Sequence, residues 1–164
     1  MSIIDTLVTD RTASDNDMLV AALERVNSGT GTAGDIELIL NPDNKGAYNY
    51  TDFNRVGASL AYVSARLNDA GAFLRLSPKT DWAEDDEPTA SQLDYYLHML
   101  HAVRDELATL PTTPVAPDSM DNMTYNEANN IEQILIDIDE LITKMATAYR
   151  HCGAAVCGIG GLIR

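Results

Sequence analysis

A heptad spacing of apolar residues occurs three times in the chain, and this pattern limits the folds that the chain can adopt. The first stripe comprises Phe53, Val56, Leu60, Val63 and Leu67. The second comprises Leu93, Tyr96, Leu100, Val103, Leu107 and Leu110, and the third Ala128, Ile131, Leu135, Ile138, Ile142, Met145 and Tyr149. Residues at this spacing share one face of an α-helix, and such a face needs a partner in water. The sequence therefore predicts an all-α fold, an elongated three-helix bundle.

Helix start and stop signals flank these stripes. Threonines precede them at positions that suit N-caps, namely Thr51, Thr89 and Thr124. Glu127 lies three residues after Thr124 and predicts a capping box. Gly71 and Pro111 are expected to end the first two helices. Before the bundle, Ser14 is expected to cap a helix over 15–27, and Thr32 one over 33–40.

A length of 164 residues suits one domain. We divide it into an extended N-terminal arm (1–12), short helices and a loop (13–50), the bundle (51–150) and an apolar tail containing Gly and Cys (151–164). The two ends lack helical periodicity, and their apolar residues are Ile3, Ile4, Leu7, Val8, Val156, Ile159, Leu162 and Ile163. We expect these extended termini to contact another copy or another protein, with pairing between the two ends of one chain as the alternative.

The charge balance excludes nucleic acids as partners. With 25 acidic and 11 basic residues, the formal net charge is -14, which repels the phosphates of nucleic acids.

No apolar run approaches the roughly 20 residues of a membrane span, and the first residues do not have the pattern of a signal peptide. Cys152 and Cys157 have neither zinc-site nor redox-motif spacing, so we expect two reduced, apolar thiols in the tail.

Two groups of residues are candidate metal sites. The loop from Asn41 to Asp52 places Asp43 and Gly46 as in a calcium loop, but Lys45 stands at a ligand position, so we expect a turn. One stripe of the second long helix carries Asp94, His98, His101 and Asp105. This stripe is expected to face solvent, where i to i+4 charge pairing explains it. We therefore expect no metal and no other cofactor.

An acidic run surrounds the single Trp of the chain. Trp82 lies among five acids that include Glu84 and Asp86, directly before the second long helix. Trp82, Tyr48 and Tyr50 are candidate ligand-facing aromatics, although a Trp that closes one end of the bundle is the more common outcome. Two carboxylates in a flexible run do not hold the fixed separation that glycoside hydrolysis needs. Because other catalytic motifs are also missing from the sequence, we expect a protein without enzymatic activity.

Four strings of the sequence resemble, in the same order, a family of phage and prophage proteins from gut-dwelling Firmicutes. They are Thr9–Thr12 (TDRT), Lys45–Val56 (KGAYNYTDFNRV), Ser77–Trp82 (SPKTDW) and Met123–Asn129 (MTYNEAN). The resemblance covers most of the chain and implies a tail, baseplate or tail-fibre structural protein with no assigned catalytic residues. The apolar, Gly-rich stretch from Cys152 to Arg164 departs from that family, in which a more polar end is expected.

The resemblance yields two hypotheses. The first is a non-enzymatic structural protein of a virion, which contacts other virion proteins and other copies of itself. It would occupy the cytoplasm of a host bacterium during assembly and the virion afterwards. The alternative is a receptor- or carbohydrate-binding module at the distal phage tail that uses Tyr48, Tyr50 and Trp82. Exposure of these three rings discriminates between the two hypotheses.

Overall fold

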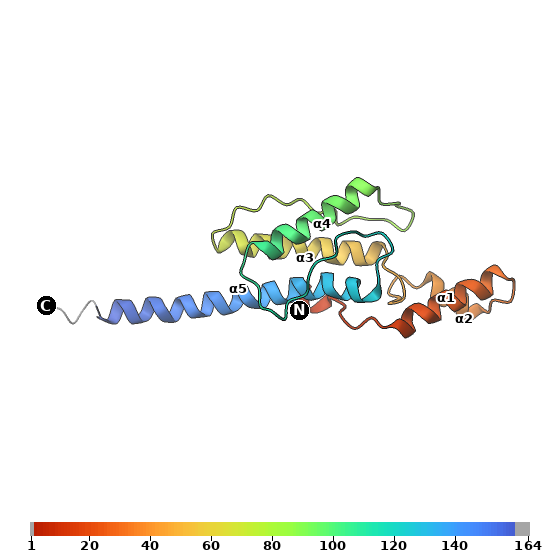
Figure 1. Ribbon diagram of the computed structural model, residues 1–164, viewed down its shortest axis with the longest axis horizontal. Coiled ribbons are helices and arrows are strands. Elements are labelled where there is room, and N and C mark those ends of the chain that lie inside the picture. Colours follow the sequence, from red (N-terminus) through yellow and green to blue (C-terminus); the bar gives the residue numbers. More distant parts are fainter. Residues whose placement is uncertain (1, 160–164) are drawn as a thin grey trace.

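Five α-helices and one short 3₁₀-helix make up the computed structural model, which describes the backbone of residues 2–159 and the side chains of residues 2–148. The elements are η1 (Ile3–Thr6), α1 (Ala13–Asn27), α2 (Ala33–Leu40), α3 (Tyr50–Asp69), α4 (Ala90–Asp105) and α5 (Tyr125–Ile159). These described residues contain no strand, so the fold is all-α, as predicted. Figure 1 shows α3, α4 and α5 side by side, with α1 and α2 beyond one end and α5 running past the others at the opposite end.

Capping boxes define the helix starts. The predicted caps Thr32, Thr89 and Thr124 are confirmed. Two predicted caps are wrong: α1 is capped by Thr12 rather than Ser14, and α3 by Asn49 rather than Thr51. In both cases an Asp three residues after the cap accepts a hydrogen bond from the cap's own N–H. This reciprocal pair satisfies two free donors at once, which selects the earlier start.

The helix ends follow the sequence less closely. Gly71 takes φ +109° just after α3, a left-handed conformation that favours glycine, and it stops the helix as predicted. α4 ends at Asp105, well before the predicted stop at Pro111. Arg104 Nε donates to the carbonyl of Pro114 at 2.9 Å, which holds the returning loop against the end of α4. Leu110 therefore lies outside the helix and is half-exposed.

The main core lies where α3, α4 and α5 contact one another in pairs. Leu60, Leu100, Leu135 and Ile138, which the three stripes predict to share one core, are all fully buried in it. The 3₁₀-helix η1 also packs on α3 and α5. The N-terminal arm is therefore not the free extended segment that the sequence predicted, because a Ser2 to Asp5 capping box turns it so that Ile4 enters the core.

The C-terminal region corrects a second prediction. α5 runs to Ile159, so residues 151–159 are helical rather than an extended tail. The three-and-four spacing of the third stripe continues after Tyr149 through Cys152, Val156 and Ile159, which explains why the helix does not stop. We call this row of residues, from Ala128 to Ile159, the α5 seam. None of the helices within residues 2–159 combines the length and the apolar character that a membrane span requires.

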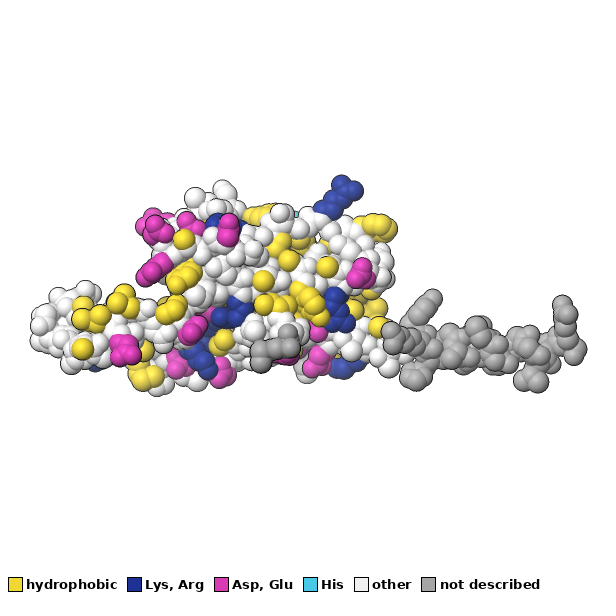
Figure 2. All heavy atoms as spheres, turned by 180° about the vertical axis from the view of Figure 1, so that it is seen from behind, with side chains coloured by type: hydrophobic (Ala, Val, Ile, Leu, Met, Phe, Trp, Pro, Cys, Tyr) yellow, Lys and Arg dark blue, Asp and Glu magenta, His cyan; other side chains and the backbone are white. Residues whose placement is uncertain are grey.

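α1 and α2 pack mainly on each other and lie outside the main core. Leu19 and Ala22 of α1 are buried, and Arg25 pairs with the carboxylate of Asp35 across the two helices. Several large apolar side chains of this pair are exposed, namely Met18, Val20, Leu23, Ile36 and Leu40. Figure 2 shows apolar side chains on the surface of this projecting end.

Candidate functional site

Four charged side chains from distant parts of the sequence meet inside the protein, and we call them the buried junction: Arg11, Asp52, Arg55 and Glu132. Arg11 Nη2 lies 2.7 Å from Asp52 Oδ1 and 2.7 Å from Glu132 Oε1. Arg55 Nη2 lies 2.8 Å from Glu132 Oε1, and Arg55 also pairs with Asp52. The exposed fraction of Arg11 is 4%, and that of Glu132 is 0%. Such charges are tolerated in a core only when each has opposite partners.

Backbone hydrogen bonds attach the N-terminal segment to this junction. The N–H of Val8 donates to Glu132 Oε2 at 2.6 Å, and Arg11 Nη1 donates to the carbonyl of Val8 at 2.7 Å. The Asn129 side chain accepts from the N–H of Arg11 at 3.0 Å and donates to its carbonyl at 2.9 Å. An amide that bonds both backbone groups of one residue fixes that residue in position, so α5 holds the chain at residues 8–11.

The charges of the junction balance one another. Two guanidinium groups balance two carboxylates, and Glu132 Oε1 and Oε2 each accept two hydrogen bonds. Burial lowers the pKa of Arg11, but the charges of Glu132 and Asp52 raise it more, so it lies above its usual value. The pKa of Arg55 is raised in the same way. Both oxygens of the Glu132 carboxylate are occupied by partners from the same chain, so the junction suits a structural role.

The junction residues were not among the site residues predicted from the sequence. Arg11 lies in the string Thr9–Thr12, and Asp52 and Arg55 lie in Lys45–Val56. Both strings were named from the sequence, but no role was assigned to the three residues. Glu132 follows the fourth string by three residues and lies beside Gln133, between Ile131 and Ile134. An acid at such a position reads as a surface residue until its partners are known.

Trp82, from the remaining string, is held against α3. Asn54 accepts from the N–H of Trp82 at 2.7 Å and donates to its carbonyl at 2.9 Å. The ring of Phe53 lies 5.5 Å from the Trp82 ring, and the ammonium group of Lys79 lies over it at 4.6 Å. The exposed fraction of Trp82 is 9%. The indole therefore closes the core and leaves little surface for a ligand.

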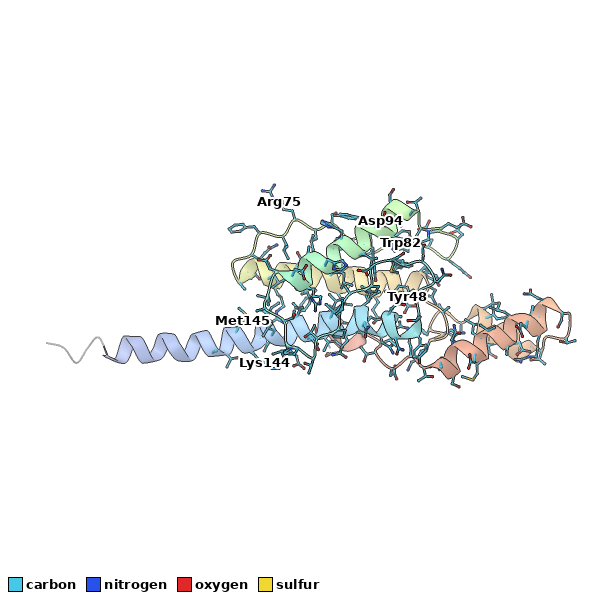
Figure 3. The ribbon with its side chains drawn as sticks, in the orientation of Figure 1. Tyr48, Arg75, Trp82, Asp94, Lys144 and Met145 are labelled. Atoms are coloured by element: carbon cyan, nitrogen blue, oxygen red, sulfur yellow. The ribbon has the colours of Figure 1, made fainter. Side chains whose placement is uncertain are left out.

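Tyr48 is also committed to contacts inside the chain. Its hydroxyl forms a hydrogen bond with the hydroxyl of Tyr96, and its ring meets Phe53 edge-on at 5.1 Å. Burial raises the pKa of Tyr48 and of Tyr96 well above the usual value, so both phenols stay protonated. Figure 3 shows Tyr48 and Trp82 near the end of the body that lies closer to α1.

A cleft of about 300 Å³ lies beside these aromatics. Its lining includes Tyr50, which is half-buried, together with Trp82, Glu84 and Asp86. Asp86 accepts hydrogen bonds from Lys79 at 3.1 Å and from the N–H of Ala83 at 3.0 Å. These bonds lower the pKa of Asp86, the one from Ala83 most, and fix its carboxylate within the loop.

The two candidate metal sites have other contacts in the structure. In the Asn41–Asp52 loop, Lys45 pairs with Asp10 at 2.7 Å and Asp52 belongs to the buried junction. On α4, Asp94, His98 and Asp105 are exposed, and the ring of His98 stacks on Tyr95. Within the part of the chain that the structure describes, no three His, Cys, Asp or Glu side chains are grouped to hold a metal ion.

The residues predicted to bind a partner divide into two sets. Ile3, Ile4 and Leu7 pack on the core of their own chain, and the N–H of Val8 donates to Glu132. This end therefore makes contacts within its own chain, but with α3 and α5 rather than with the other terminus. The side chains of Val156 and Ile159, and all of Leu162 and Ile163, lie outside the described residues. An intermolecular role is therefore retained for the C-terminal set alone.

Comparisons of the chain with protein-family models, with curated proteins and with solved structures give no match. Function is therefore inferred from the junction, the cleft and the helix surfaces.

Proposed function

We propose that the protein is a non-enzymatic structural component of a phage or prophage virion, in a tail, a baseplate or a fibre attachment. Its body would be an elongated three-helix bundle of α3, α4 and α5, an interpretation that their pairwise packing supports. It would occupy the host cytoplasm during assembly and the virion afterwards, in contact with other virion proteins and with other copies of itself.

The buried junction carries this proposal. The strings that resemble the phage family supply Arg11, Asp52 and Arg55, and another of them supplies the Trp82 backbone clamp. These residues hold three parts of the chain against α3, namely the N-terminal segment, the loop between α3 and α4, and α5. They present no reactive group to solvent. Residues that serve the fold in this way support a structural component rather than an enzyme.

The alternative of a receptor- or carbohydrate-binding module depends on exposed aromatic rings. Trp82 is buried beneath Lys79, and the hydroxyl of Tyr48 is engaged with Tyr96. Tyr50 alone does not make the stacking platform that a sugar ring needs. Nothing in the described part of the chain favours this alternative over the structural role.

Particle composition tests the proposal. The prophage of the bacterium that encodes the chain is induced, particles are purified on a density gradient, and their proteins are quantified by mass spectrometry. We expect the chain in the particle band at a fixed ratio to other tail proteins. A Glu140→Ala variant, altered at a side chain that is 61% exposed, should be incorporated equally well. Complete, infectious particles that lack the chain would overturn the proposal.

A further inference from the structure

α5 leaves the core at a definite point. Ile142 is still buried, whereas the side chains of residues 143–148 are all exposed. α3 has ended at Asp69 and α4 at Asp105, so neither helix accompanies α5 further. Figure 3 shows Lys144 and Met145 on α5 where it passes the end of α3. A helix that stands alone in water is marginal unless its apolar stripe is covered.

A groove of about 530 Å³ opens at this exit point, and we call it the end groove. Its lining is mostly apolar and includes Leu67 of α3, Leu107 after α4, and Ile142 and Met145 of α5. The exposed fraction of Met145 is 45%. Asp69 places one acidic side chain at the groove. The groove is thus an apolar receptacle at the base of the emerging helix.

The α5 seam continues past the groove without a change of register. After Ile142 and Met145, the sequence places Tyr149, Cys152, Val156 and Ile159 at alternate spacings of four and three. In a sustained heptad these are the a and d positions, which pack against a second helix in a coiled coil. The 18 residues from Ile142 to Ile159 span about 27 Å at 1.5 Å per residue.

The charge distribution selects the occupant of this face. All 25 acidic residues lie at or before Glu140, whereas Lys144, Arg150 and Arg164 follow it. A parallel pair of these segments would place the two strongly acidic bodies side by side, where they repel each other. An antiparallel pair separates the two bodies and runs the basic segment of each copy toward the acidic body of the other, where Asp69 lines the end groove. The face is thus complementary to a second copy of the same chain.

We propose that two copies of this chain pair through their α5 seams in antiparallel orientation, with the end of each α5 seated in the end groove of the other. Packing a positions on d positions fixes the register. Ile142 then faces Ile159 of the partner subunit, Met145 faces Val156 of the partner subunit, and Tyr149 faces Cys152 of the partner subunit. The interface is isologous, so each contact occurs twice and the pair is closed.

This inference names the surface for the self-association in the proposed function, but it does not depend on the virion. Presence in particles and pairing through α5 are measured separately. A chain that is incorporated as a monomer would contradict the pairing alone, and a dimer missing from particles would contradict the virion role alone.

Sedimentation equilibrium of the full chain provides the first test. Met145→Asp places a charge in the seam, and Thr147→Asp places the same charge on the opposite side of the helix. Val156→Asp alters the seam far from the core. We expect a dimer for the wild type and Thr147→Asp, and monomers that keep the thermal unfolding transition of the body for Met145→Asp and Val156→Asp. A monomeric wild type, including one that binds lipid vesicles through this segment, or a dimeric Met145→Asp variant overturns the proposal.

Cysteine crosslinking tests the orientation. In a background with Cys152→Ser and Cys157→Ser, Met145→Cys and Val156→Cys are prepared as separate chains. Facing positions of packed helices come within disulfide reach, so we expect a crosslink when the two chains are mixed and oxidised, and little crosslinking of either chain alone. Efficient crosslinking between two Met145→Cys chains, with none between Met145→Cys and Val156→Cys chains, would indicate a parallel pair and overturn the proposal.

Discussion

The two parts of α5 differ in how they use the same helical stripe. Up to Ile142 the helix is covered by α3, α4 and η1, and it contributes Glu132 to a junction with two arginines. From residue 143 the side chains are exposed up to the last one described, and the charges are basic. The first part joins segments of one chain, and the second presents a surface that matches another copy.

The difference shows what polar and apolar contacts each contribute. Apolar packing stabilises any arrangement that buries the side chains, so it is compatible with several registers of the packed segments. A buried ion pair adds little net stability, but it penalises every arrangement that leaves one charge unpaired. We infer that the junction selects a single path for residues 8–11, whereas the open seam supplies association without affecting the fold of the body.

The largest effect is expected when the junction is broken. Glu132→Ala leaves Arg11 and Arg55 buried with one carboxylate between them. The free energy of unfolding should fall by about 3 to 5 kcal/mol, as for other buried pairs that lose one partner. Urea unfolding followed by circular dichroism measures it. The matched control is Glu140→Ala on the same helix, which should change stability by no more than about 0.5 kcal/mol. Equal losses in the two variants would contradict a structural junction.

The second prediction compares apolar residues of the two parts. Leu135→Ala creates a cavity in the core and should cost about 2 to 5 kcal/mol. Met145→Ala, at the exposed part of the same seam, should cost less than about 1 kcal/mol when unfolding is measured on dilute protein. A loss below about 0.5 kcal/mol for Leu135→Ala would contradict the shared core.

A smaller, pH-dependent effect is expected at the α1–α2 pair. Hydrogen bonds from Arg25, and then from Thr32, lower the pKa of Asp35 below its usual value. The folded state therefore favours the carboxylate, and this stabilisation is present above the ordinary pKa of about 3.9 and is lost as the pH falls. Asp35→Asn should lower the melting temperature at pH 7. Its difference from wild type should narrow between about pH 5 and 2, whereas a constant difference would exclude this ionisation as the cause.

The smallest effect is expected from chelation. Thermal melts with and without a chelator should coincide, because Lys45 and Asp52 are engaged in ion pairs and His98 stacks on Tyr95. A large fall in melting temperature on chelation would show that the Asp43 loop or the α4 histidines hold a metal.

The cap threonines predicted the starts of α2, α4 and α5. Heptad spacing predicted the all-α fold and the core positions of Leu60, Leu100 and Leu135, because burial is periodic along a helix. It could not predict the caps of α1 and α3, where two polar residues compete locally. It also could not predict the junction, since Arg11 and Glu132 are 121 residues apart and each alone suits a surface. The sequence also failed to predict that α5 continues to Ile159, because Gly153 and Gly158 disfavour a helix in a segment where the apolar stripe continues through Val156.

Hydrogen–deuterium exchange along α5, measured at several protein concentrations, tests the division of this helix most directly. Amides in residues 128–142 should be protected equally at every concentration, because the core of one chain covers them. Amides in residues 146–159 should exchange quickly in dilute protein and gain protection as the concentration rises, because a second copy covers them. Protection of the second segment that is independent of concentration would contradict pairing between copies, and so would rapid exchange at all concentrations.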